Sequence, residues 1–151
     1  PYEQYAERSP FELSGGQKRR AALAGILATR PEILVLDEPM AGLDPVGREE
    51  ILSLIRQLNA EGTTIVMVSH SMDDIARLCD RVLVVNESHM LMLGTPSEVY
   101  SRSEELVKVG LGLPSAAKLS GLLREKGLAL PEGIFRQEQL ETLLIERWEH
   151  A

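Results

Sequence analysis

Two short, uniformly apolar runs set the strongest limit on the fold of this chain. Residues 33–36 and 64–68 are too short for helices and rich in β-branched side chains. A segment with helical apolar spacing separates them, starting at Asp44-Pro45 and ending at Gly62. This order predicts an α/β fold with a mostly parallel sheet, in which both strands are buried on both faces.

Capping signals predict further helices on either side of these strands. Ser14 is a suitable N-cap for a helix that Pro31 closes. Ser71 and Thr95 begin patterns typical of capping boxes, and each predicts a helix.

The C-terminal part of the chain has a different pattern. Residues 82–85 and 90–93 predict a hairpin. Beyond Leu113 the leucines fall at helical spacing, which predicts two amphipathic helices and no strand. We therefore expect one domain at 1–113 and a small helical appendix at 114–151.

Composition narrows the functional classes. The 151 residues are 44% hydrophobic and 26% charged, which is sufficient for a core, and their net charge is −7. An acidic chain does not bind nucleic acid through bulk electrostatics, so we expect no nucleic-acid partner. No apolar run approaches the roughly 18 residues that span a bilayer, and the single Cys79 excludes an internal disulfide. We expect a soluble chain that recognises its ligands locally.

The first candidate site is the start of the helix after Ser14. Gly15 and Gly16 let an anion approach the backbone, and free N–H groups, the helix dipole and the Ser14 hydroxyl favour negative charge there. Gln17 completes the motif. The alternative is a solvated helix cap, which Ser-Gly-Gly alone does not exclude.

The second candidate site is the end of the first apolar run, where Asp37 and Glu38 follow each other. Neighbouring residues at a strand end point in different directions, so one carboxylate could hold Mg²⁺ and the other could orient or deprotonate water. A simple surface turn is the alternative.

Two further motifs follow in the chain. Gly42-Leu43-Asp44 forms a tight loop in which Asp44 is expected to cap the next helix whether or not it has another role. His70 directly follows the second apolar run, at the edge where open α/β sheets bind ligands, although a lone histidine is more often structural.

Together these motifs resemble the second half of an ABC-type ATPase domain, a P-loop NTPase. Residues 13–17 resemble its signature motif, residues 33–38 its Walker B strand, residues 42–44 its D-loop and His70 its switch histidine. The four motifs occur in the family's order and with appropriate spacing.

The resemblance implies ATP and Mg²⁺ as cofactors and assigns roles to the residues. Glu38 would be the general base, Asp37 would hold Mg²⁺, His70 would contact the γ-phosphate and Asp44 would couple two sites. Residues 14–17 would contact ATP bound to the other subunit of a head-to-tail dimer.

Residues 9–20, 69–72 and 111–114 resemble the ATPase subunits of energy-coupling factor transporters. These import vitamins or, in the cobalt and nickel branch, metal ions. The implied partners are a second ATPase subunit, as homodimer or heterodimer, a transmembrane coupling subunit and a substrate-binding membrane subunit. The implied location is the cytoplasmic face of the cell membrane.

The sequence contains no Gly-x-x-x-x-Gly-Lys motif, so it has no phosphate-binding loop of this kind. We expect a fragment of a longer domain, with an exposed strand edge that favours self-association and no ATP hydrolysis on its own. A non-transport ABC ATPase and a catalytically silent, partner-binding cassette fragment are the alternatives.

Other residues receive structural interpretations. We expect Lys18-Arg19-Arg20 to be a solvated or partner-facing flank, Cys79 to be a small buried hydrophobe, and Trp148 to be a packing anchor. Leu140, Leu144 and Trp148 could also contact the second ATPase. The remaining residues are Met90 and Met92, expected to pack in the hairpin or core, and His89 and His150, which lack the partners of a metal site.

Overall fold

The computed structural model describes residues 8–149, and the chain divides into two compact units, Pro1–Val68 and Ser69–Ala151. Each unit is described by itself. The first unit ends inside the segment 1–113 that was expected to be one domain, and the domain boundary at 113/114 stays a prediction. No helix among the described residues is both long and apolar enough to cross a bilayer.

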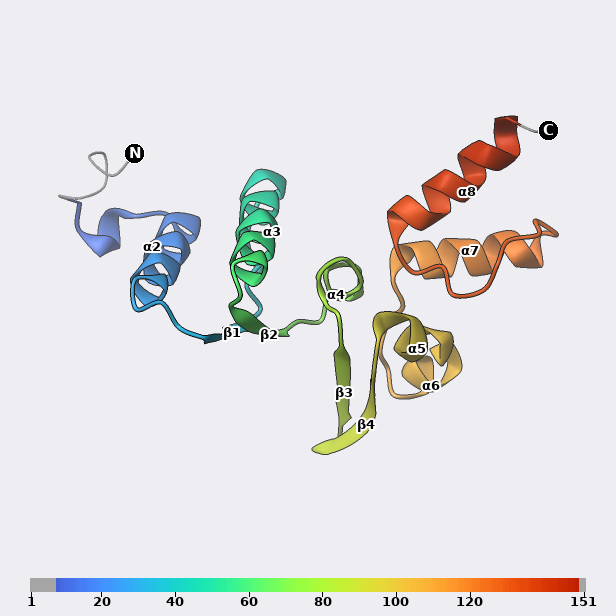
Figure 1. The fold of residues 1–151 in the computed structure, drawn as a ribbon, viewed down its shortest axis with the longest axis horizontal. Helices are drawn as coiled ribbons and strands as arrows, with labels where there is room; N and C mark the ends of the chain where they lie inside the picture. The colour runs from blue at the N-terminus through green and yellow to red at the C-terminus, as the bar shows by residue number, and fades with distance from the viewer. Residues whose placement is uncertain (1–7, 150–151) are drawn as a thin grey trace. The chain divides into compact units, whose positions relative to one another are not determined.

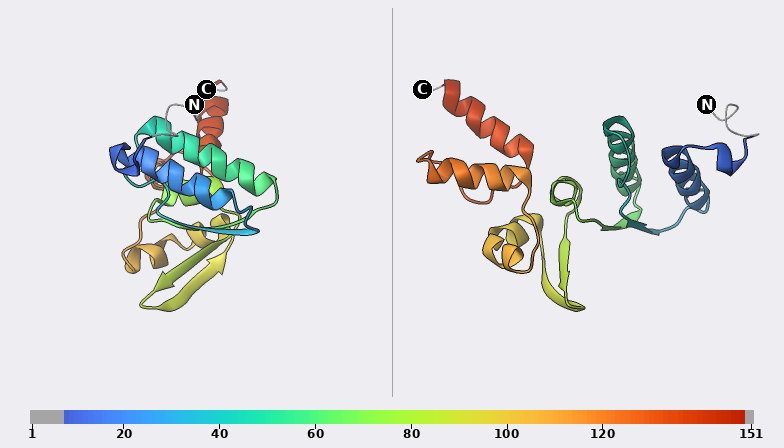
Figure 2. Two further views of the ribbon diagram at one scale, coloured as in Figure 1. Left: turned by 90° about the vertical axis from the view of Figure 1, so that its left-hand side faces the viewer. Right: turned by 180° about the vertical axis from the view of Figure 1, so that it is seen from behind.

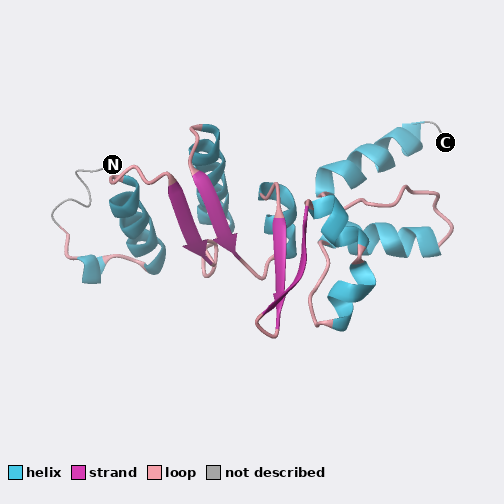
Figure 3. Cartoon of the chain, turned by 60° about the horizontal axis from the view of Figure 1, so that its bottom comes forward, coloured by secondary structure: helices cyan, strands magenta, loops and turns pink. Residues whose placement is uncertain are grey.

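The first unit contains the predicted strand, helix and strand. A short 3₁₀ helix η1 (Pro10–Glu12) precedes α2 (Gly15–Leu27), β1 (Ile33–Asp37), α3 (Pro45–Ala60) and β2 (Thr64–Val68). The two strands are parallel, with Asp37 paired to Val68, and they run side by side in Figure 3. This confirms the predicted parallel arrangement.

The prediction that both strands are buried on both faces is wrong. Helices α2 and α3 lie on the same side of the sheet (Figures 1 and 2). Leu34, which points to that side, is 3% exposed, whereas Val35 is 65% exposed and Val66 is 47% exposed. Within the described residues of this unit, one layer of helices therefore covers one face only.

Helix α2 also differs from its expected packing. Its apolar residues recur at helical spacing, yet none of its residues is fully buried. Ile26 is 51% exposed. In contrast, α3 buries Ile51, Leu52 and Ile55 and contacts β2, so α3 supplies most of the unit's packing.

In its described part, residues 69–149, the second unit combines a helix, a hairpin and four further helices. Helix α4 (Met72–Leu78) precedes the antiparallel strands β3 (Val82–Asn86) and β4 (His89–Gly94), which confirms the predicted hairpin. The remaining elements are the helices α5 (Pro96–Ser101), α6 (Ser103–Lys108), α7 (Ser115–Glu125) and α8 (Gln137–Glu149). The last two confirm the helices predicted beyond Leu113.

The hairpin is irregular, and this overturns one packing prediction. Val84 pairs with Met92 but Val85 pairs with Met90, so one extra residue interrupts the register. Such a bulge moves the following side chains to the other face of the strand. Met92 is 3% exposed and belongs to the core, whereas Met90 is 66% exposed.

Two hydrophobic clusters hold this unit together. The larger brings residues of α4, the hairpin, α5 and α6 together with Phe135, and Tyr100 and Phe135 have ring centroids 5.9 Å apart. The smaller lies in the C-terminal segment and includes Leu140, with Leu144 partly buried beside it. Trp148 is 86% exposed, so it is not the expected packing anchor. His89 is exposed, and His150 lies outside the described residues.

Candidate functional site

A complete capping box starts α2 at the predicted anion-binding motif. The Ser14 hydroxyl accepts a hydrogen bond from the Gln17 backbone N–H at 3.3 Å, and the Ser14 N–H donates to Gln17 Oε1 at 2.9 Å. The first N–H groups of a helix have no acceptor within it. The Gly15 and Gly16 N–H groups are thus the ones that the motif can offer to an anion.

Packing among the described residues does not require the two glycines. A Cβ at Gly15 would meet no atom within 4 Å, and one at Gly16 would lie 3.5 Å from Leu43 Cδ2, an ordinary contact. Their lack of side chains therefore leaves open space in front of the helix start, and a ligand could approach the backbone there.

The two predicted carboxylates lie at the carboxyl end of β1 and occupy different environments. Asp37 is exposed and continues the pairing with Val68, whereas Glu38 is half-buried and has a left-handed backbone with φ of 45°. The Glu38 N–H donates to the Val68 carbonyl at 2.9 Å. This conformation is costly for a residue with a side chain, and surrounding contacts must hold it in place.

The residues present fit a Mg²⁺ site of the phosphate-assisted kind. Mg²⁺ prefers oxygen ligands and commonly uses one or two carboxylates together with substrate phosphates and water. Asp37 offers an exposed carboxylate at the strand end. Among the described residues no group of three or more His, Cys, Asp or Glu side chains could hold a metal by itself.

The loop after Glu38 connects the carboxylates to α3. Gly42 has φ of 72°, and Asp44 caps α3 by accepting a hydrogen bond from the Gly47 N–H at 2.8 Å. A Cβ at Gly47 would lie 2.9 Å from Asp44 Oδ1, so a side chain there would displace the capping carboxylate. The expected capping by Asp44 is confirmed, and its coupling role stays a prediction.

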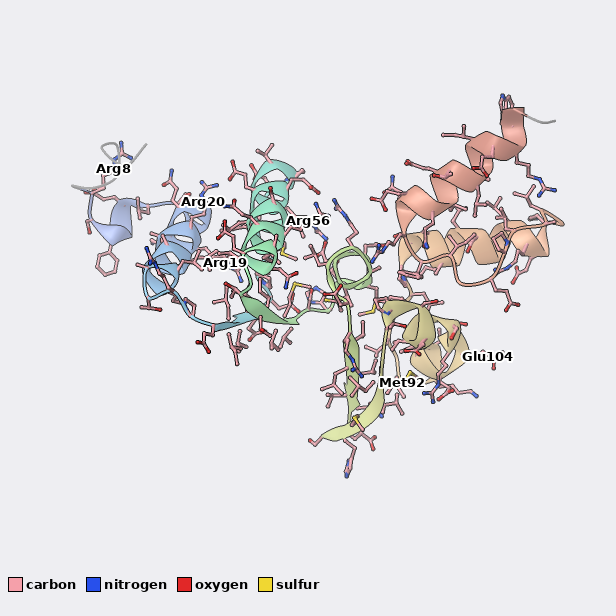
Figure 4. The ribbon with its side chains drawn as sticks, viewed as in Figure 1. Arg8, Arg19, Arg20, Arg56, Met92 and Glu104 are labelled. Atoms are coloured by element: carbon pink, nitrogen blue, oxygen red, sulfur yellow. The ribbon has the colours of Figure 1, made fainter. Side chains whose placement is uncertain are left out.

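Arg19 is the residue of this region that the sequence interpretation missed. Its guanidinium donates to the carbonyl of Ala41 at 2.8 Å, to that of Asp37 at 3.3 Å and to that of Glu38. Arg20, the next residue of α2, pairs with Glu50 at 2.6 Å. Figure 4 labels both arginines. Lys18 and Arg20 are exposed, which agrees with the expected solvated or partner-facing flank, whereas the half-buried Arg19 binds within the chain and departs from it. No sequence signal identifies which carbonyls an arginine will reach.

His70 is the second residue of the other unit, where a short turn holds it ahead of α4. The Ser71 N–H donates to Ser69 Oγ at 3.1 Å, and Ser71 Oγ in turn caps the helix by accepting from the Asp74 N–H at 3.4 Å. His70 is exposed. Its predicted contact with the γ-phosphate stays a prediction.

The C-terminal segment anchors α4, which the sequence did not indicate. The Ser115 N–H and hydroxyl each donate to a carboxylate oxygen of Asp73 at 2.8 Å. Arg136 Nε donates to the Ala76 carbonyl at 2.8 Å. The two helices of the C-terminal segment are therefore attached to the helix that follows His70.

Burial changes two titratable groups near α4. It raises the pKa of the Cys79 thiol, with a smaller effect from Asp80, and it raises the pKa of the Tyr100 phenol. Tyr100 donates from its hydroxyl to the Met72 carbonyl at 3.2 Å. Cys79 is only partly buried, although it packs against the core as expected.

Comparison with known families gives one match to the first half of the chain. A family model described as "AAA domain, putative AbiEii toxin, Type IV TA system" matches residues 1–73, just under half of the sequence.

Curated relatives match nearly the whole chain. The energy-coupling factor transporter ATP-binding protein EcfA2 of Clostridium perfringens is 51% identical over 146 residues, which is 96% of this chain and 51% of that protein. EcfA2 of Symbiobacterium thermophilum is 53% identical over 88% of this chain and 46% of that protein. The chain thus spans about half the length of the curated relatives it matches.

Solved structures give the same fold. The cbiO1 protein of Clostridium perfringens, part of the ABC transporter complex cbiONQ, is 36% identical with a TM-score of 0.58, over 81% of this chain and 48% of its own. An ATP-binding cassette of another ABC transporter is 26% identical with a TM-score of 0.63, over 73% of this chain and 45% of its own.

Proposed function

The chain belongs to the ATP-binding proteins of ABC transporters, and from this premise we propose that it is the catalytic half of an energy-coupling factor ATPase cassette. In the complete cassette it would couple ATP hydrolysis to substrate uptake. The curated relatives named as energy-coupling factor ATP-binding proteins support this proposal.

The observation that carries the proposal is the pair of carboxylates at the end of β1. Asp37 is exposed and Glu38 is half-buried on a left-handed backbone, so the two acids can perform separate tasks. Asp37 would hold Mg²⁺, which when bound neutralises charge on the phosphates. Glu38 would orient the attacking water and accept its proton.

The start of α2 would act on a nucleotide held by the other ATPase subunit. Open space in front of Gly15 supports approach of a phosphate to the Gly15 and Gly16 N–H groups. Ser14 and Gln17 would keep that helix start in place through their capping box and contact the same phosphate. His70 would contact the γ-phosphate, and Asp44 would couple the two sites.

The partners would be a second ATPase subunit, a transmembrane coupling subunit and a substrate-binding membrane subunit, at the cytoplasmic face of the membrane. The substrate would be a vitamin or a transition-metal ion. The 151 residues alone would not hydrolyse ATP, because their sequence has no phosphate-binding Gly-x-x-x-x-Gly-Lys loop.

The test is Glu38→Gln in the complete cassette, assembled with its transporter partners. We expect kcat for ATP hydrolysis to fall by about 10² to 10⁴, the usual contribution of a general base, with ATP affinity retained. Glu32→Gln is the matched control, because Glu32 is an exposed carboxylate just before the other end of β1. Equal kcat values for the two variants would contradict the role assigned to Glu38, and a complete cassette without ATP turnover would favour the silent, partner-binding alternative.

A further inference from the structure

Arg19 joins two parts of the candidate site that are far apart in the sequence. It lies in α2, one turn beyond the Ser14-Gly15-Gly16 helix start, and it donates to carbonyls at the end of β1 and in the following loop. Those carbonyls belong to Asp37, Glu38 and Ala41.

The chemistry of the contact suits an arginine specifically. A guanidinium is planar and carries five N–H donors in a fixed fork, whereas a lysine ammonium is a compact point charge. Nη1 binds the Ala41 carbonyl and Nη2 binds the Asp37 and Glu38 carbonyls. One side chain therefore fixes both ends of the turn that follows β1.

The turn that Arg19 fixes contains a strained residue. Glu38 has φ of 45°, a conformation that surrounding contacts must hold in place. The Glu38 N–H donates to the Val68 carbonyl, and the Glu38 carbonyl accepts from the Ala41 N–H at 3.1 Å and from the Arg19 guanidinium. Of these, only Arg19 comes from α2.

We propose that Arg19 is a positioning residue that holds the Glu38 peptide in its left-handed conformation and links the start of α2 to the loop carrying the carboxylates. The inference rests on the proposed function, because it assigns Arg19 its effect through Glu38. The start of α2 would meet one nucleotide, and the Glu38 carboxylate would act on another. Through Arg19 these two groups would belong to one rigid element.

The test compares Arg19→Ala with Lys18→Ala, the matched control, in the complete cassette. Both remove one positive charge from the same turn of α2, and Lys18 is exposed. We expect Arg19→Ala to lower kcat by about 10²-fold with ATP affinity unchanged, since small displacements of a catalytic group cost about that much. Arg19→Lys keeps the charge and should recover only part of the loss.

A double-mutant cycle separates positioning from a general structural role. If Arg19 acts through the Glu38 carboxylate, Arg19→Ala added to Glu38→Gln lowers kcat no further. Hydrogen exchange on the 151-residue chain gives a second readout that needs no activity. Arg19→Ala should speed exchange of the amides of Glu38, Ala41 and Leu43, whereas Lys18→Ala should not.

The outcomes distinguish this inference from the proposed function. If Glu38→Gln abolishes turnover but Arg19→Ala behaves like Lys18→Ala, the positioning role alone is wrong. If Arg19→Ala weakens ATP binding at constant kcat, the arginine does not act through Glu38. If Glu38→Gln has no effect, the proposed function fails, while faster exchange in Arg19→Ala would still establish the structural link.

Discussion

Leu52 offers the sharpest test of how the first unit is held together. Its side chain has 0% exposure and lies on the face of α3 that also buries Ile51 and Ile55. Leu52→Ala removes the branched end of the side chain and leaves a cavity between α3 and the sheet. Substitutions of this type cost about 2–5 kcal/mol, depending on how far the surroundings relax.

The open sheet face places the expected cost in the lower part of that range. Val35 and Val66 are exposed on the far face, so the sheet can shift toward the cavity with little resistance. We expect a loss of about 2–3 kcal/mol, or about 30- to 140-fold in the unfolding equilibrium, since 1.4 kcal/mol is about tenfold.

Amide hydrogen exchange along β1 measures this loss locally, without signal from the second unit. Exchange of the β1 amides that bond to β2 should accelerate by the same factor in Leu52→Ala. Val46→Ala is the control on the same helix, because Val46 is 69% exposed and its truncation should change stability by no more than about 0.5 kcal/mol. Wild-type protection in Leu52→Ala, or equal effects of the two variants, would refute the packing assigned to α3.

Three further predictions concern charge, reactivity and association. The Thr95 backbone N–H donates to the Glu98 carboxylate and lowers its pKa. The capping box is therefore intact at neutral pH and is lost as the pH falls through that lowered pKa. Thermal unfolding of Glu98→Gln should show a weaker loss of stability in acid than that of the wild type. Burial raises the pKa of Cys79, so its reaction with a disulfide reagent at mildly alkaline pH should be slower than that of a free cysteine, and an equal rate would contradict its packing. Because one face of the sheet is exposed, the 151-residue chain should self-associate as its concentration rises. Val35→Lys should reduce this self-association in sedimentation velocity. Identical profiles for the variant and the wild type would place the self-association surface elsewhere.

The sequence predicts the elements of this chain well because their signals are local. Capping by Ser14, Asp44 and Thr95 was expected from the residue types, and each of these side chains accepts a hydrogen bond from the third residue of its helix. The parallel pairing of the two apolar runs followed from the helix between them.

Burial and long-range contacts were beyond local reasoning. Val35 lies in an apolar run typical of a strand buried on both faces, yet what covers a strand depends on layers that its own residues do not encode. The exposure of Met90 could be predicted only with knowledge of the β-bulge in the hairpin. Likewise, Arg19 and Arg136 each bind carbonyls distant in sequence. Every residue has a backbone carbonyl, so the residue type does not show which carbonyl will accept the bond.

Candidate site residues at helix starts both cap a helix and have a proposed role in ATP hydrolysis, which affects how that role can be tested. Ser14 and Asp44 each cap a helix, and an alanine substitution at an N-cap costs about 0.5–2 kcal/mol. Loss of activity in Asp44→Ala would therefore mix a frayed α3 with a lost coupling contact. Asp44→Asn keeps the cap, because asparagine caps as well as aspartate, and removes only the charge. A fall in turnover in the Asn variant with unchanged exchange of the α3 amides would thus belong to the charge, and an unchanged turnover would leave Asp44 a helix cap alone.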